Sequence, residues 1–151
     1  MLDILKVALL SILPISELRG GIPLGLALGI NPVTVFLVAV ISNILAIPLI
    51  FFFLDNIHKR LMKYNKYKKF FDYYIERSRN KLESRIGTKA EFIALMIFVG
   101  IPLPGTGAWT GAILAWFFNM KRARAYLSVS LGVLIAGIAV MLASLGIIAL
   151  F

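Results

Sequence analysis

The chain has 151 residues, 60% of them hydrophobic, and its mean hydropathy is +0.92. Uncharged runs of 35, 29 and 27 residues are longer than a soluble core of this size requires, so the composition excludes an ordinary soluble domain and predicts an all-α integral membrane protein. The net charge of +9 is uneven, because 11 of the 16 Lys and Arg residues lie between residues 59 and 89. The positive-inside rule accounts for such clustering, and we expect no nucleic-acid partner.

The first apolar stretch, residues 2–13, leads into a segment that combines charge with helix-breaking residues. The helix-breaking residues of this segment are Pro14, Gly20, Gly21 and Pro23. Glu17 and Arg19 lie among them, between an uncharged run of ten residues and one of 35. Charged groups at membrane depth are costly and usually functional, and irregular backbone survives there only where protein or water satisfies it. The segment therefore predicts a substrate site at the tip of a broken helix.

Glu17 and Arg19 are the candidate substrate and proton site. An arginine stays charged and offers a planar fork of donors that suits phosphate or carboxylate. Desolvation and a neighbouring arginine shift the pKa of a carboxyl group in opposite directions, so Glu17 is a candidate for loading and unloading protons. The structural alternative is an ion pair that only closes the hairpin tip.

Residues 33–54 form the first stretch long enough to span a bilayer, and residues 126–151 form the second. A second broken stretch lies between them, at residues 92–118. Its predicted tip residues are Pro102, Pro104, Gly105, Thr106 and Gly107, with Trp109 and Thr110 as further hydrogen-bond donors. Each arm of the two broken stretches reaches only about half of a bilayer, which predicts re-entrant hairpins.

The hairpins also decide the predicted topology. If both broken stretches are re-entrant, the basic cluster at 59–89 and the one at 121–124 lie on the same face, as the positive-inside rule requires. We therefore expect one multi-pass domain of the plasma or inner membrane, with both termini outside. Its predicted parts are hairpin 1–30, transmembrane helix 31–54, basic amphipathic cytoplasmic segment 55–91, hairpin 92–119 and transmembrane helix 120–151.

The two halves are predicted to be inverted repeats. A shift of 88 residues superposes Pro14 on Pro102, Asn31 on Asn119 and Ser42 on Ser130. Interrupted segments at matching positions of inverted repeats mark the binding sites of secondary transporters. Chance similarity between apolar sequences is the alternative.

Two further patterns concern partners. In residues 55–91, Tyr64, Tyr67, Phe70, Phe71 and Tyr74 recur among lysines, which predicts a helix lying on anionic membrane lipid. The small residues Gly132, Ala136, Ala139 and Ala143 recur at helical spacing, which fits either packing within the chain or a homodimer seam.

One histidine and no cysteine predict no metal site and no cofactor. No nucleophile is paired with a base in the sequence pattern, so we expect neither catalytic residues nor an enzyme.

The sequences ELRGGIP at residues 17–23 and PLPGTGAWTG at residues 102–111 resemble the small multidrug export protein family. The resemblance covers nearly the whole chain. That family is similar to the DedA/VTT membrane proteins, which implies two re-entrant hairpins, each followed by a spanning helix, and movement of polyprenyl-phosphate and other lipids. By this resemblance Glu17 and Arg19 take the acidic and basic roles of the first hairpin. The chain departs from DedA proteins in its second hairpin, where no arginine lies between Glu91 and Lys121.

Three functional hypotheses follow. The first is a DedA-like transporter or lipid translocase that moves an anionic polyprenyl-phosphate or phospholipid, coupled to protons through Glu17. The second is a proton-coupled exporter of small amphipathic cations, for which Glu17 is the ligand. The third is a non-transporting scaffold or insertase-like factor that acts through its basic loop, where Lys63, Lys66, Lys68 and Lys69 would matter more than Glu17.

Overall fold

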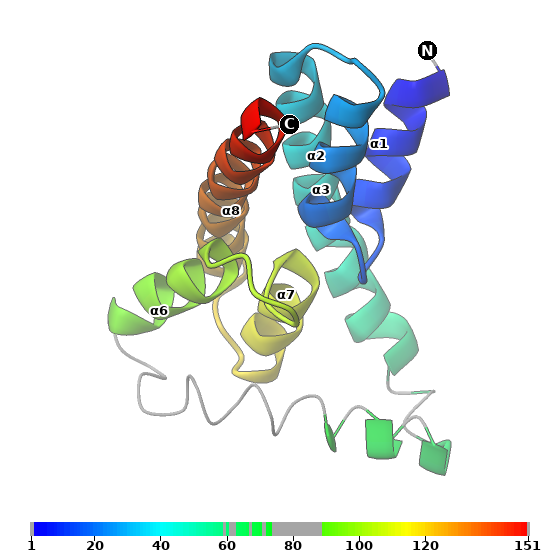
Figure 1. The fold of residues 1–151 in the computed structure, drawn as a ribbon. Coiled ribbons are helices and arrows are strands. Elements are labelled where there is room, and N and C mark those ends of the chain that lie inside the picture. The colour runs from blue at the N-terminus through cyan, green and yellow to red at the C-terminus, as the bar shows by residue number, and fades with distance from the viewer. Residues whose placement is uncertain are drawn as a thin grey trace.

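A computed structural model describes residues 2–58, 60, 63–66, 68–70, 72–73 and 89–150. The elements of this part of the chain are all helical: α1 (Leu2–Ile12), α2 (Glu17–Ala27), α3 (Pro32–Phe53), the π-helical turn η1 (Leu54–His58), α6 (Lys89–Gly100), α7 (Ala108–Phe117) and α8 (Arg122–Leu150). Two short helices precede one long helix in each half (Figure 1).

The long helices α3 and α8 confirm the prediction of two apolar helices long enough to cross a membrane. They have 22 and 29 residues, about 33 and 44 Å as α-helix. Asn31 begins α3, because its side chain accepts hydrogen bonds from the backbone N–H groups of Val33 and Thr34. Pro32 follows at the first helical position, where the missing N–H costs nothing.

The first break in the chain is shorter than the sequence suggested. The prediction that it extends from Pro14 to Pro23 is wrong in its second half, because α2 already begins at Glu17 and contains Gly20, Gly21 and Pro23. Gly21 is needed here for close packing, since a Cβ atom would overlap the hydroxyl of Ser11 and lie 3.1 Å from the carbonyl oxygen of Val7, both in α1. Pro23 continues the helix but cannot donate the N–H that would bond to the carbonyl of Arg19.

The second break, between α6 and α7, matches the predicted tip more closely. Residues 101–107 form an irregular turn, in which Pro102, Pro104 and Gly105 are exposed and Thr106 and Gly107 are buried. Trp109 and Thr110 lie in the first turn of α7.

The ends of α1 and α6, at Ile12 and Gly100, correspond at the predicted shift of 88 residues, whereas the ends of α2 and α7 correspond at a shift of 90. Gly29 (φ +73°) follows α2 and Asn119 (φ +53°) follows α7, each in the left-handed conformation that ends a helix. The next residues make the same closing bond, from Ile30 N–H to Gly25 O and from Met120 N–H to Ala115 O. Asn31, by contrast, is the N-cap of α3. The predicted superposition of Asn31 on Asn119 therefore pairs a residue that begins a helix with one that follows the end of a helix.

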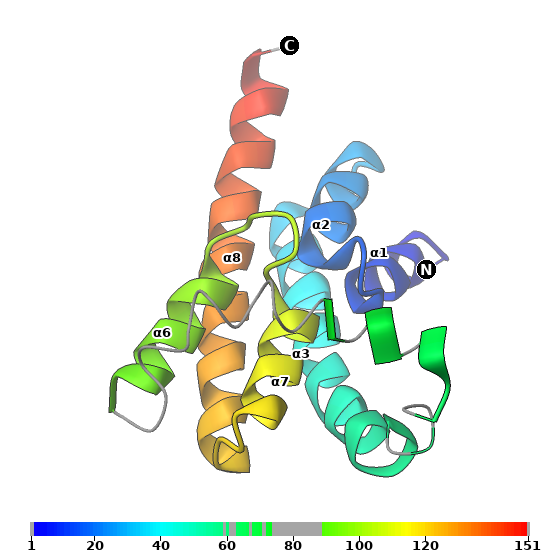
Figure 2. The same cartoon turned by 90° about the horizontal axis from the view of Figure 1, so that it is seen from below.

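The long helices hold the two helix pairs together. α1 and α2 pack on each other and on α3, whereas α6 packs on α8, and α7 lies between α3 and α8 (Figures 1 and 2). The chain termini lie at one end of the molecule and the end of α3 at the other (Figure 1). α7 thus joins the second half to the first, and the starts of α2 and α7 come together.

Two further predictions concerned the small-residue stripe at residues 132–143 and the amphipathic helix within residues 55–91. Gly132 packs on Val99 of α6 and Ala136 is buried within the chain, whereas Ala143 is exposed, so the small-residue stripe serves packing within the chain at its first two positions. The amphipathic helix predicted within 55–91 lies largely outside the described residues.

Candidate functional site

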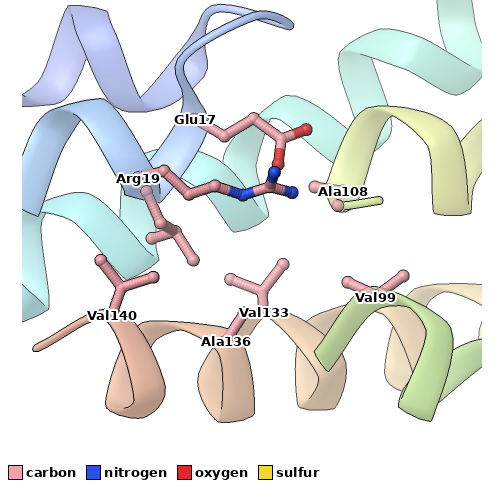
Figure 3. Close-up of a pocket in the computed structure, with 9 residues that line it drawn as sticks. Glu17, Arg19, Val99, Ala108, Val133, Ala136 and Val140 are labelled. Atoms are coloured by element: carbon pink, nitrogen blue, oxygen red, sulfur yellow. The ribbon is translucent and has the colours of Figure 1, made fainter. Parts of the chain in front are cut away.

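Glu17 and Arg19 both lie in the first turn of α2, where this helix meets the second half of the chain. Glu17 is only 8% exposed, although it is charged at neutral pH in water. Its backbone has φ +46°, the left-handed region that non-glycine residues rarely occupy and that recurs at functional sites. Figure 3 shows the side chains of Glu17 and Arg19 directed together toward the start of α7.

The carboxylate of Glu17 caps the N-terminus of α7. The backbone N–H of Trp109 donates to Glu17 Oε1 at 3.2 Å, and the N–H of Ala108 also bonds to this carboxylate. The N-terminus of a helix carries partial positive charge and unpaired N–H groups, so it stabilises an anion. Gly107, the N-cap residue of α7, supplies no side-chain bond of its own. Glu17 from the first half therefore provides the cap that α7 lacks.

Gly107 leaves the space that the Glu17 carboxylate occupies. Its φ is +151°, a conformation that is accessible to glycine and strained for other residues. A Cβ atom at this position would overlap the Glu17 carboxylate. Both the backbone conformation and the contact therefore require glycine.

Arg19 binds the backbone of the second tip. Its Nη2 donates to the carbonyl oxygen of Thr106, and it lies 3.4 Å from Thr106 Oγ1. Thr106 also shapes the tip, because its hydroxyl donates to the carbonyl of Ile101 at 2.6 Å and accepts from the N–H of Leu103 at 3.1 Å. The turn thus presents one carbonyl to Arg19 and, two residues later, the first N–H groups of α7 to Glu17.

Trp109 adds a third contact between the two helix pairs. Its indole Nε1 donates to the carbonyl of Ile12 at 2.8 Å, at the C-terminal end of α1. Thr110, in the next position, is 3% exposed. Of the predicted site residues, the structure therefore brings together Glu17, Arg19, Thr106, Gly107 and Trp109. Pro14 and Pro23 are exposed at other positions of the first helix pair.

A cavity of about 10 Å³ adjoins Glu17 and Arg19, which is room for about one water molecule. Its other walls are apolar and come from Val99 of α6 and from Val133, Ala136 and Val140 of α8 (Figure 3). The cavity itself is therefore too small for a ligand larger than water.

A second polar cluster, which was not predicted from the sequence, lies at the other end of α7. Arg122 Nη2 donates to Asp55 Oδ1 and Oδ2 at 2.5 and 2.7 Å, and Trp116 Nε1 donates to Oδ1 at 2.8 Å. The guanidinium of Arg122 also lies 4.3 Å from the centre of the Phe51 ring. The signal that could have revealed this cluster is the position of Asp55 directly after 35 uncharged residues.

These features define the class of the protein, a helical membrane protein in which a buried glutamate and a partly buried arginine lie between two helix pairs. The chain matches the sequence profile of the family described as "Putative small multi-drug export protein" over residues 17–139, and it belongs to that family. The match begins at Glu17, so it includes Arg19 and the turn at 101–107 but neither α1 nor Pro14. Comparison with curated proteins and with solved structures gives no match.

Proposed function

We propose that this protein is a proton-coupled membrane transporter that moves amphipathic molecules with an anionic headgroup, in the manner of a lipid translocase. The observation that carries the proposal is the pair of contacts between the halves, Glu17 with the N-terminus of α7 and Arg19 with the carbonyl of Thr106. One acidic and one basic side chain meet at the point where both helix breaks converge. The family description is consistent with export.

In the proposed mechanism the carboxylate of Glu17 occupies the site at the N-terminus of α7 to which a substrate anion would bind. When Glu17 takes up a proton, its carboxyl group loses the charge that favours the N-terminus of α7. The freed N–H groups of Ala108 and Trp109, together with Arg19, then offer donors to a phosphate or carboxylate headgroup. Release of the headgroup allows Glu17 to lose its proton and return. One proton is thus taken up for each anion bound.

The apolar walls of the cavity support an amphipathic substrate. Val133, Ala136 and Val140 line the side of α8 that faces Arg19, so an apolar chain can follow these residues once the helices separate. A small hydrophilic anion would gain nothing from this wall.

The lengths of the helices support re-entrant hairpins. α1, α2, α6 and α7 have 10 to 12 residues, about 15 to 18 Å as helix, whereas a hydrocarbon core is about 30 Å thick. We propose that each helix pair enters the membrane to half its depth and returns, and that the two halves are inverted repeats. This arrangement places the segment 55–91 in the cytoplasm and both termini outside.

The second candidate is proton-coupled export of small amphipathic cations, which the family description favours. In that mechanism the carboxylate of Glu17 leaves α7 to bind the cation. The neighbouring guanidinium of Arg19 opposes it by like-charge repulsion, which is why we place it second.

Proteoliposomes distinguish the two candidates. One assay follows the transbilayer movement of a fluorescent polyprenyl phosphate, and another follows the efflux of ethidium. The proposal predicts that Arg19→Ala abolishes movement of the polyprenyl phosphate while the protein stays folded, and that Arg124→Ala, an exposed arginine on α8, leaves it unchanged. Normal movement in Arg19→Ala would contradict the proposal. Ethidium efflux that tolerates Arg19→Lys but is lost in Glu17→Gln would establish the cation exporter.

A further inference from the structure

The groove beside Asp55 and Arg122 lies at the opposite end of α7 from the Glu17 site. It has a volume of about 480 Å³, within the range of small-molecule sites in proteins. The residues that line it are Pro48, Phe51, Phe52, Asp55, Asn56, Arg122, Ala123 and Tyr126. One end of the groove is therefore charged and the other is apolar.

The charged end is better prepared for an anion than for a cation. Among the described residues, every hydrogen bond that Arg122 donates comes from Nη2, which leaves the N–H groups of Nε and Nη1 for a ligand. The carboxylate of Asp55 already accepts from Arg122 and Trp116. The ring of Phe51 packs against the guanidinium and helps to fix its plane. Arg122 is thus oriented in advance, and its side chain is half exposed.

The surrounding charge has the same sign. Lys121, the residue before Arg122, is also exposed. The first turn of α8, which begins at Arg122, contains no acidic residue, and its helix dipole adds further positive potential.

The apolar end continues into the exposed face of α3. Leu45, Leu49 and Phe52 are 55%, 61% and 65% exposed and recur at intervals of three and four residues, which places them on one side of the helix. Phe52 belongs to both this face and the groove. A ligand with a charged head in the groove would therefore lay an apolar tail along α3.

We propose that this groove binds the phosphate headgroup of an anionic phospholipid, with Arg122 bonding to the phosphate and with Pro48 and Phe52 contacting an acyl chain. Asp55 acts as a positioning residue that holds the guanidinium. The site is separate from Glu17 and Arg19, and it does not depend on what those residues transport.

Native mass spectrometry of the full chain in detergent tests this site, with dioleoyl phosphatidylglycerol and dioleoyl phosphatidylcholine as probes. The wild type is expected to retain phosphatidylglycerol in preference to phosphatidylcholine. Arg122→Gln is expected to weaken binding of phosphatidylglycerol by about tenfold, because charge-assisted hydrogen bonds are lost. The matched control Arg124→Gln removes the same charge outside the groove and is expected to weaken binding by less than about twofold. Equal losses in both variants, or no preference in the wild type, would overturn the proposal.

A second pair of variants leaves the charge unchanged and serves if Arg122→Gln does not fold. Ala123 lines the groove, whereas Ala143 is exposed further along α8. Ala123→Trp is expected to displace phosphatidylglycerol by filling the groove, and Ala143→Trp is expected to bind it as the wild type does. Retention of phosphatidylglycerol by Ala123→Trp would overturn the proposal.

Discussion

The helix pairs α1–α2 and α6–α7 have similar lengths but different chemistry at the start of the second helix. α2 begins with Glu17, whereas the residue before α7 is Gly107, which has no side chain. The two starts face each other, and the carboxylate of Glu17 fills the space at Gly107. Only the first half therefore carries the titratable group of this site, while the second half supplies the backbone groups that bind it.

The same division applies to the basic residue. Arg19 extends from the first half, and its partner in the second half is the carbonyl of Thr106. The second pair therefore contributes N–H groups and a carbonyl, which mutation of side chains cannot remove directly. The absence of an arginine between Glu91 and Lys121 agrees with this one-sided arrangement.

The largest expected effect comes from a side chain added at Gly107, in the second half of the chain. Gly107→Ala is predicted to lower the free energy of unfolding by about 3 kcal/mol, since it combines backbone strain with displacement of the Glu17 carboxylate. It should also abolish transport. Chemical denaturation in detergent and transport in proteoliposomes measure the two effects.

Gly105→Ala is the matched control for Gly107→Ala. Gly105 has φ +81°, so alanine is strained there too, but a Cβ atom would meet open space. We expect a loss of about 1 kcal/mol and retained transport. Equal effects at the two glycines would mean that the contact with Glu17 contributes nothing.

Substitution of Glu17 is expected to lower stability less than Gly107→Ala does and to change the pH dependence of transport. Glu17→Gln keeps the shape of the side chain and removes its charge from the N-terminus of α7, which should cost about 1 kcal/mol. Transport should lose the pH dependence that titration of Glu17 confers, because no other described acid lies at this site. Glu91→Gln, in the first turn of α6, is the control and should keep the pH profile of the wild type.

The smallest expected effect concerns the third contact between the pairs. Trp109→Phe removes the hydrogen bond from the indole to the carbonyl of Ile12 and should cost about 1 kcal/mol. Trp116→Phe removes a comparable bond to Asp55, whose side chain is half exposed, and should cost about 0.5 kcal/mol or less. A larger loss for Trp116→Phe would show that the cluster around Asp55, rather than the hairpin tips, holds the halves together.

Local signals in the sequence predicted the long helices and the position of each break. The uncharged runs gave α3 and α8, and the prolines and glycines of residues 100–107 gave the turn before α7. Gly20, Gly21 and Pro23 did not break α2, because the two glycines allow close packing against α1 and Pro23 lies at an exposed position of the helix. A helix-breaking residue predicts a break only when tertiary packing does not compensate for it.

Contacts between distant segments could not be predicted in the same way. Glu17 and Arg19 could be identified from their charge, but their partners are backbone groups 87 to 92 residues away. Every residue type has such backbone groups, so the sequence does not indicate which of them form these bonds. The predicted shift of 88 residues holds at the ends of α1 and α6, whereas the ends of α2 and α7 correspond at 90, since the turn at 101–107 is longer than the one at 13–16.

The central claim is that Glu17 takes up a proton when an anion takes its place at α7. The direct test is to add farnesyl phosphate to the purified protein in weakly buffered detergent and to follow the pH with an indicator dye. We expect the wild type to take up about one more proton per molecule than Glu17→Gln does. Subtracting the Glu17→Gln trace removes the protons that the ligand itself binds or releases. Identical traces for the wild type and Glu17→Gln would contradict the account, and release of protons on adding tetraphenylphosphonium would favour the cation exporter instead.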